Sequence, residues 1–267
     1  MKRFKYSESS RNNLLKSNNK FILPKRHALQ HFKTGAIYSF IPKNACSTMR
    51  FSLAVENGCL SESSDVNWIH HNNGTFNTSL RELFSTPYSF VILRCPYRRL
   101  VSSFLDKIVS KKNDAWQFIN SINRSINIDS LTFEDFVTKL ENKNILNSNI
   151  HWRPQSDFLL YENYDEYFCL EDFQTLTKTL KNKIDFNVID TRNQLNHDSS
   201  RLANKHYPES YKLSIHDLYL LKMNNDLPIY KSFYNNKIMN SLQNMYSEDF
   251  ELYRNNCDAK FLLFADL

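Results

Sequence analysis

The sequence predicts an α/β fold with a central parallel sheet covered by helices on both faces. Residues 36–41 and 88–93 are two candidates for buried strands, and each is followed by a turn and an apolar pattern of helical spacing. A third strand candidate, residues 166–170, precedes a predicted helix at 171–182. Strands that alternate with helices are typical of parallel sheets, because the crossover helices cover both faces.

The first strand–turn–helix unit begins at residue 36. Residues 36–41 are rich in β-forming side chains and are bounded by Gly35 and Pro42. The run MRFSLAVEN, residues 49–57, is predicted to be a helix, and Gly58 stands where helices commonly end.

The second unit joins the strand at 88–93 directly to a helix. The apolar residues of this helix recur at helical spacing and predict one buried stripe, formed by Tyr97, Leu100, Val101, Phe104, Leu105 and Ile108. Beyond residue 112 the pattern predicts a helix-rich C-terminal half. Thr132 with Asp135, and Ser214 with Asp217, match the capping boxes that start helices.

Length and composition suit one domain with a short lead-in. The chain has 267 residues, of which 41% are hydrophobic, which is enough for one substantial core. Residues 1–35 are polar and basic without a clear period, so we expect a flexible or peripherally packed lead-in there and a single domain over 36–267. Neither a secretion signal nor an apolar stretch of membrane-spanning length is expected.

Charge and cysteine content narrow the class of protein further. The formal net charge of +6 suits an anionic ligand, although a solvated surface excess explains it as well. The basic residues form no recognised nucleic-acid motif, so no nucleic-acid partner is expected. The five cysteines are odd in number and lack a CxxC pair, which argues against a disulfide framework and a zinc or other metal site. Reduced thiols predict a cytoplasmic location.

The turn after the first strand has the composition of a phosphate-binding loop. Lys43 is followed there by small or polar residues, namely Asn44, Ala45, Cys46, Ser47 and Thr48. Such a turn directs successive backbone N–H groups at one point, at the positive end of a helix dipole. The ammonium of Lys43 and the two hydroxyls add further donors. An ordinary helix cap, with Lys43 in solvent, is the alternative.

The turn after the second strand predicts another anion site. Arg94 ends the strand, and Arg94, Arg98 and Ser102 are spaced so that a helix would place them on one face. A guanidinium and a hydroxyl near a helix start can bind a phosphate, although a solvated basic face also explains this segment. Parallel strands end at the same edge of a sheet, so the two sites fit a ligand phosphorylated at both ends.

Four segments together resemble one enzyme family. PKNACSTMR and LRCPYRRLVSSFLDK resemble the 5'-phosphosulfate loop and the 3'-phosphate segment of the family 2 sulfotransferases. HWRPQSDFL (151–159) and MYSEDFELY (245–253) are similar to further segments of that family. The resemblance implies a three-layer fold with a P-loop-like core and 3'-phosphoadenosine-5'-phosphosulfate (PAPS) as the sulfate donor. It also implies a hydroxyl acceptor on a carbohydrate, which would be a glycan or glycolipid.

The resemblance also assigns roles to the residues of the two loops. The 5'-phosphosulfate would be held by the side chains of Lys43, Ser47 and Thr48 and by the backbone of Asn44, Ala45 and Cys46. Arg94 and Ser102 would hold the 3'-phosphate. Cys95 departs from the family pattern, because many relatives carry an acidic residue after the arginine.

Sulfuryl transfer needs a base for the acceptor hydroxyl and a cation at the leaving oxygen. Lys43 fits the second role, and we predict His70 as the base in preference to His71. Exposed loop histidines without a role are the alternative. His71, His151 and Arg153 are predicted to contact the acceptor, although the HWRPQ segment also fits a packed structural corner. No metal is required by this chemistry.

Two other functions fit parts of the pattern. A P-loop-type nucleotide kinase shares the strand–loop–helix order, but the chain has only three glycines, lacks GxxxxGK[ST] and shows no evident acidic magnesium ligand. A non-catalytic module that binds glycan or RNA is suggested by the basic balance and the 14 tyrosines. Residues 195–202 give only a weak signal for a loop over the nucleotide.

Overall fold

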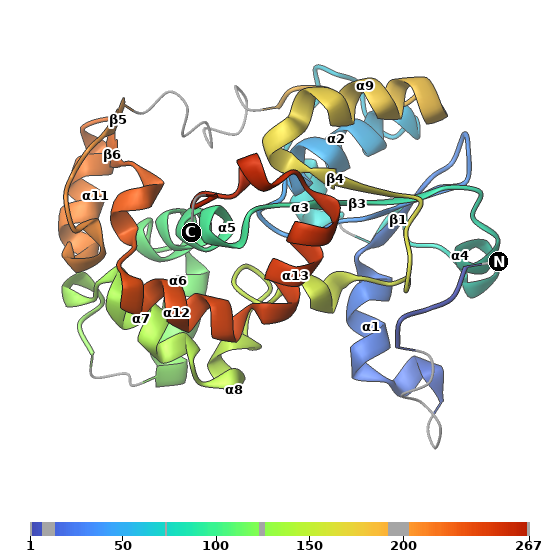
Figure 1. Ribbon diagram of the computed structural model, residues 1–267. Coiled ribbons are helices and arrows are strands. Elements are labelled where there is room, and N and C mark those ends of the chain that lie inside the picture. Colours follow the sequence, from blue (N-terminus) through green and yellow to red (C-terminus); the bar gives the residue numbers. More distant parts are fainter. Residues whose placement is uncertain (1, 7–13, 73, 123–125, 192–202, 266–267) are drawn as a thin grey trace. The chain divides into compact units, whose positions relative to one another are not determined.

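The computed structural model describes residues 2–6, 14–72, 74–122, 126–191 and 203–265. The protein is a mixed α/β structure with a mostly parallel four-stranded sheet and many helices (Figure 1). None of the described helices is long and apolar enough to cross a membrane.

The chain divides into two compact units, and each is described by itself. Unit 1 comprises Met1–Arg94, Gln155–His197 and Asn255–Cys257. Unit 2 comprises Cys95–Pro154, Asp198–Arg254 and Asp258–Leu267.

The sheet lies in unit 1 and has the order β1-β2-β3-β4. Its strands are β1 (Ala28–His31), β2 (Ala36–Ser39), β3 (Ser89–Leu93) and β4 (Glu166–Cys169). β2, β3 and β4 are parallel, with Ile37 opposite Ser89 and Phe90 opposite Glu166, whereas β1 pairs antiparallel with β2. The three predicted strands are therefore confirmed. β1 was not predicted, because this four-residue edge strand includes the polar Gln30 and His31.

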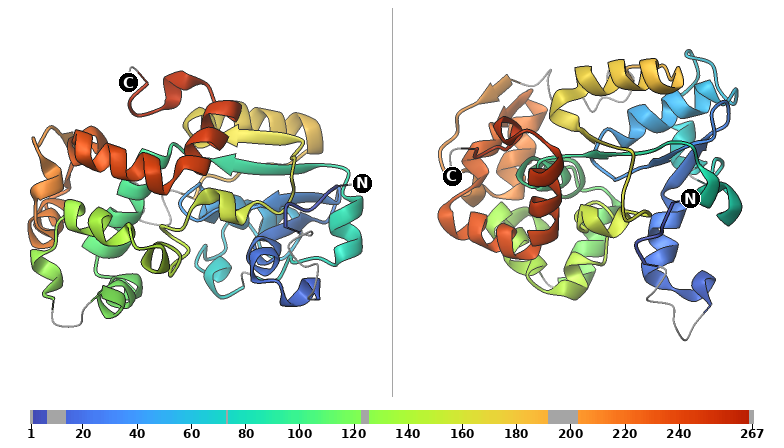
Figure 2. Two further views of the ribbon diagram at one scale, coloured as in Figure 1. Left: turned by 60° about the horizontal axis from the view of Figure 1, so that its bottom comes forward. Right: turned by 45° about the vertical axis from the view of Figure 1, so that its right-hand side comes forward.

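Two helices of unit 1 cover one face of this sheet. The helices of unit 1 are α1 (Asn19–Arg26), α2 (Cys46–Glu56), α3 (Trp68–His71), α4 (Leu80–Ser85) and α9 (Phe173–Ile184). Leu53 of α2 and Leu180 of α9 share a buried cluster with the strand residues Phe90 and Ile92. The right-hand view of Figure 2 shows α2 in light blue beside α9 in yellow. Gly58, with φ of 76°, follows α2 and confirms the predicted end of that helix.

The first residues of the chain also belong to the core of unit 1. Phe4 and Phe21 are only 1% and 2% exposed. The ring of Phe4 lies 5.2 Å from that of Phe21 and 5.7 Å from that of Tyr161, measured between centroids. Together with β1, these contacts place parts of residues 1–35 in the packed interior, which their polar composition did not predict.

Unit 2 is mainly helical, as predicted. Its helices are α5 (Pro96–Ser103), α6 (Asn113–Ile122), α7 (Phe133–Leu140), α8 (Lys143–Leu146), α11 (Ile215–Met223), α12 (Asn236–Met245) and most of α13 (Ser247–Asn256). A short parallel pair, β5 (Ala203–Lys205) and β6 (Asp226–Pro228), accompanies them. Aromatic rings fill the interior, and those of Phe104 and Phe133 meet edge to face at 5.1 Å.

The local signals of unit 2 are confirmed, with one addition. Every residue of the predicted apolar stripe is buried. α5 ends at Ser103, however, and the backbone continues as a π-helix over Phe104–Val109, which the spacing did not predict. Thr132 and Ser214 cap α7 and α11, and each accepts a hydrogen bond at 3.1 Å from the third residue of its helix.

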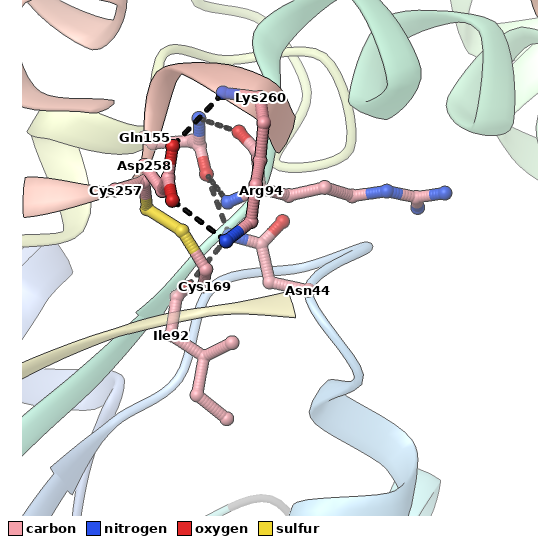
Figure 3. Close-up of a disulfide and its surroundings, with 8 residues drawn as sticks. All are labelled: Asn44, Ile92, Arg94, Gln155, Cys169, Cys257, Asp258 and Lys260. Carbon is pink, nitrogen blue, oxygen red and sulfur yellow. Dashed lines mark hydrogen bonds and ion pairs between the residues drawn. A yellow bond between two sulfur atoms is a disulfide. The ribbon is translucent and has the colours of Figure 1, made fainter. Parts of the chain in front are cut away.

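Cys169 at the end of β4 forms a disulfide with Cys257, which follows α13 (Figure 3). The two residues are 88 positions apart, and their Cα atoms are 5.8 Å apart. This bond corrects the expectation that all the thiols are reduced. Scattered cysteines carry no local signal of pairing, because only the folded chain brings them together. The cytoplasmic location stays a prediction.

Candidate functional site

The turn between β2 and α2, residues 42–45, makes its bend without glycine. Lys43 and Ala45 both have left-handed backbone conformations, with φ of 73° and 56°. Non-glycine residues rarely adopt this region, which costs about 1 kcal/mol or more for each residue. Two strained residues thus lie in the loop that the sequence predicts as a phosphate cradle. We call residues 42–48 loop 1.

The start of α2, within loop 1, is not capped by a side chain. Ala45 is the N-cap residue, and the helical hydrogen bonds begin with Met49 N donating to Ala45 O at 3.0 Å. The N–H groups of Cys46, Ser47 and Thr48 therefore have no acceptor within the helix. In contrast, α1, α7, α9, α11 and α12 each begin with a side-chain cap. An uncapped helix start, at the positive end of the dipole, is suited to an anion.

Two of the predicted donor-binding residues in loop 1 have protein partners of their own. The N–H of Asn44 donates to Ile41 O at 3.2 Å, and its side chain is fully buried. The hydroxyl of Thr48 shares a hydrogen bond of 2.9 Å with that of Thr191. Ser47 is half-buried. Asn44 thus holds the shape of the loop, while the first turn of α2 presents its N–H groups.

Arg94 directly follows β3 and contacts loop 1. Its guanidinium Nη1 donates to Lys43 O at 2.8 Å. β2 and β3 are adjacent and parallel, so their carboxyl ends meet at one edge of the sheet. The structure therefore brings together Lys43 and Arg94, the two cations that the sequence placed in separate loops.

The predicted helical face of Arg94, Arg98 and Ser102 is corrected by the position of α5. This helix begins at Pro96, so Arg94 precedes it and only Arg98 and Ser102 share its spacing. Pro96 has no N–H group and a fixed φ, which suits the first residue of a helix. The helical spacing therefore does not extend back to Arg94. Ser102 is half-buried and belongs to unit 2, whereas Arg94 belongs to unit 1.

The histidine pair lies on α3, which packs against α2. Arg50 of α2 donates from Nη2 to Ile69 O at 2.6 Å, and Ile69 is buried against Phe51. Both His70 and His71 are exposed. The contact from Arg50 thus anchors the residue before His70 to the helix that starts at loop 1.

His151 and Arg153 lie in unit 2 and surround a buried tryptophan. Trp152 is fully buried, and its indole N–H donates to Ile145 O at 3.0 Å. His151 Nε2 is 3.5 Å from a carboxylate oxygen of Asp114, and Arg153 O accepts from Arg99 Nη1 at 2.8 Å. These three residues therefore form a packed corner, as the structural alternative predicted. The half-buried side chains of His151 and Arg153 belong to a different unit from His71.

Gln155, which lies beside Asn44 of loop 1 and Arg94, was not predicted from the sequence. Its side chain is fully buried and hydrogen-bonds to Asn44 and to the main chain of Arg94 (Figure 3). The only signal was its place at the end of the HWRPQ segment, because a single glutamine has no periodicity.

Two remaining expectations concern a loop and a metal. Residues 195–202, the weak candidate for a loop over the nucleotide, lie outside the described residues. Within the described part of the chain, no group of three or more His, Cys, Asp or Glu side chains is placed to hold a metal ion.

The chain matches the model of a known protein family. A model of the sulfotransferase family, family 2, matches residues 26–255. Searches of curated proteins and of solved structures find no match to the chain. The matched span begins before the expected domain boundary at residue 36, and it includes loop 1, the histidine pair, Arg94 and Gln155.

Proposed function

The chain belongs to the family 2 sulfotransferases, and on this premise we propose that it transfers a sulfuryl group from PAPS to a hydroxyl of a carbohydrate. The family supports sulfuryl transfer in general, and its members generally use PAPS. The observation that carries the proposal is that loop 1 contains the uncapped start of α2 and also accepts a hydrogen bond from the Arg94 guanidinium at Lys43 O. An uncapped helix start beside a guanidinium suits a nucleotide with phosphates at both ends.

The fold is proposed to be of the three-layer type with a P-loop-like core. Support comes from the parallel strands β2, β3 and β4 and from the strand–loop–helix connection at loop 1. In such sheets ligands bind outside the carboxyl ends of the strands. Loop 1 and Arg94 both lie at that edge.

The proposed mechanism assigns the donor to loop 1 and Arg94. The first turn of α2 and the hydroxyls of Ser47 and Thr48 bind the 5'-phosphosulfate, and the Arg94 guanidinium binds the 3'-phosphate. The acceptor oxygen attacks sulfur in line, while the bond from sulfur to the bridging phosphate oxygen breaks. Lys43 stabilises the negative charge that develops on that leaving oxygen.

The acceptor hydroxyl must lose its proton during the attack. We assign His70 as the general base that takes this proton. His71, the next residue, is assigned to binding of the acceptor. Exposure leaves both imidazoles accessible to a large hydroxylated substrate such as a glycan or glycolipid. Ser102, His151 and Arg153 belong to unit 2, and their contacts with the 3'-phosphate and the acceptor stay predictions.

Ligand-dependent melting tests the proposal. We expect adenosine 3',5'-bisphosphate, the product of the donor, to raise the melting temperature more than ADP or ATP at equal concentration. At a hundredfold excess over Kd, binding adds about 2.7 kcal/mol to the free energy of unfolding. Stabilisation and hydrolysis of ATP with magnesium would favour a kinase instead. Salt-sensitive heparin or RNA binding without any response to the bisphosphate would favour a binding module.

A further inference from the structure

The buried amide of Gln155 joins loop 1 to the residue that ends β3. Its Oε1 accepts hydrogen bonds from Arg94 N at 3.0 Å and from Asn44 Nδ2 at 2.6 Å. Its Nε2 donates to Arg94 O at 2.9 Å. Figure 3 shows these bonds as dashed lines. Gln155 and Asn44 are both fully buried, so the bonds are shielded from water.

The side chain of Gln155 binds Arg94 as a neighbouring strand would. It accepts from the N–H and donates to the C=O of the same residue, which is the bonding pattern of an antiparallel pair. Arg94 has left the ladder of β3, so this amide takes the place of a strand partner. Its main chain is thereby fixed at the edge where the donor is proposed to bind.

Asn44 completes the link from the side of loop 1. One Nδ2 hydrogen goes to Gln155 and the other to Ile92 O at 2.8 Å, within β3. Reversing either amide would bring oxygen against oxygen, so the pattern of donors and acceptors determines both orientations. Loop 1 is consequently tied at one point to the last residues of β3 and to Gln155.

We propose that Gln155 is a positioning residue that sets the separation between loop 1 and Arg94, so that both ends of a doubly phosphorylated nucleotide are bound at once. This inference rests on the proposed function. A ligand that spans two sites loses affinity when the distance between them is free to vary, because ordering the sites then opposes binding. A ligand that occupies loop 1 alone does not depend on that distance.

The comparison of a two-ended and a one-ended ligand tests this role. Gln155→Met keeps the volume of the side chain and removes all three bonds. Calorimetry should show about tenfold weaker binding of adenosine 3',5'-bisphosphate and less than about a twofold change for 5'-AMP. An equal change for both ligands, or none for either, would overturn the role, since simple loss of structure does not discriminate between them.

Ser89→Ala is the matched control. Ser89 is also fully buried, and it begins β3, the strand that Arg94 follows. Its hydroxyl donates to Asp165 at 3.0 Å, at the end of the strand away from Arg94. This variant should lose stability, while the ratio of the affinity for adenosine 3',5'-bisphosphate to the affinity for 5'-AMP stays at the wild-type value. A changed ratio in the control would contradict the assignment to Gln155.

Asn44→Ala provides a second route if Gln155→Met does not fold. It breaks the link on the side of loop 1 but leaves the bonds between Gln155 and Arg94, and it should lower the same ratio. Where both fold, the double variant should lose less than the sum of the single losses, because the two amides act through one network. Additive losses would overturn the inference. A wild-type chain that does not bind the bisphosphate would refute the proposed function itself, and the ligand role of Gln155 with it.

Discussion

In the proposed reaction, Lys43 stabilises the negative charge on the leaving oxygen, and His70 accepts the proton of the acceptor hydroxyl. Lys43 lies in the strained turn before the uncapped start of α2, and His70 follows the residue that Arg50 anchors. Neither residue is part of the buried core. Their substitution should therefore change the chemistry more than the folding.

We expect Lys43→Ala and His70→Ala each to lower kcat by at least about a hundredfold. The melting temperatures should stay close to that of the wild type, because both side chains lie outside the core. Turnover of the sulfate donor, measured together with melting curves, checks this. His71→Ala is the matched control, since His71 is exposed on the same short helix and should retain turnover with a weaker affinity for the acceptor. Normal turnover in the His70 variant and loss in the His71 variant would move the base to His71.

Single side chains were predictable where a motif surrounds them. Lys43 and Arg94 follow predicted strands, and their contact in the structure agrees with the expected edge of the sheet. The buried amides of Asn44 and Gln155 were not predictable. These two residues bond to each other but are 111 positions apart in sequence. The role of an amide can be recognised only when its donors and acceptors are in place.

Among the helices, the starts were the most reliable predictions, because a capping box is formed by residues that are close in sequence. Thr132 and Asp135 form both bonds of such a box at α7. The edge strand β1 and the π-helix at Phe104–Val109 were missed. Both depend on packing, which overrides local preference. β1 pairs through its backbone with β2. The π-helix has a wider turn than the α-helix that the apolar stripe predicted.

Removal of the cap tests the contribution of α7. Thr132→Ala should lower the free energy of unfolding by about 1 kcal/mol, because the N–H of Asp135 loses its acceptor. Urea denaturation followed by circular dichroism measures this change. Thr132→Ser keeps the hydroxyl and should stay near the wild type. A serine variant as unstable as the alanine variant would show that the methyl group, and not the cap, stabilises the helix.

At the scale of the whole chain, the bond between Cys169 and Cys257 is expected to contribute to stability. It closes a long loop, from the end of β4 to the residue after α13. Cross-linking a loop of this length restricts the unfolded chain, and native disulfides typically contribute about 2–4 kcal/mol. The bond also bears on the compartment, since stable disulfides form in oxidising surroundings.

Two measurements test the disulfide. Peptide mapping without reductant should recover the peptides of Cys169 and Cys257 linked together, and Cys169→Ser should lower the melting temperature by several degrees. Cys59→Ser is the control, because Cys59 is exposed and should not affect melting. The disulfide would be contradicted if protein purified without reductant gave both peptides as free thiols and the Cys169 variant melted like the wild type. Both cysteines would then be reduced, as the cysteine spacing suggested.

The order of strands, turns and helices around loop 1 and Arg94 could be inferred from the residues alone. Apolar runs, turn residues and helix caps act over a few neighbouring positions, and the family motifs are equally compact. Folding alone decided which distant groups meet: β1 with β2, Asn44 with Gln155, and Cys169 with Cys257. Such contacts are set by how the whole chain packs and by the cost of closing long loops, and no short stretch of residues records either.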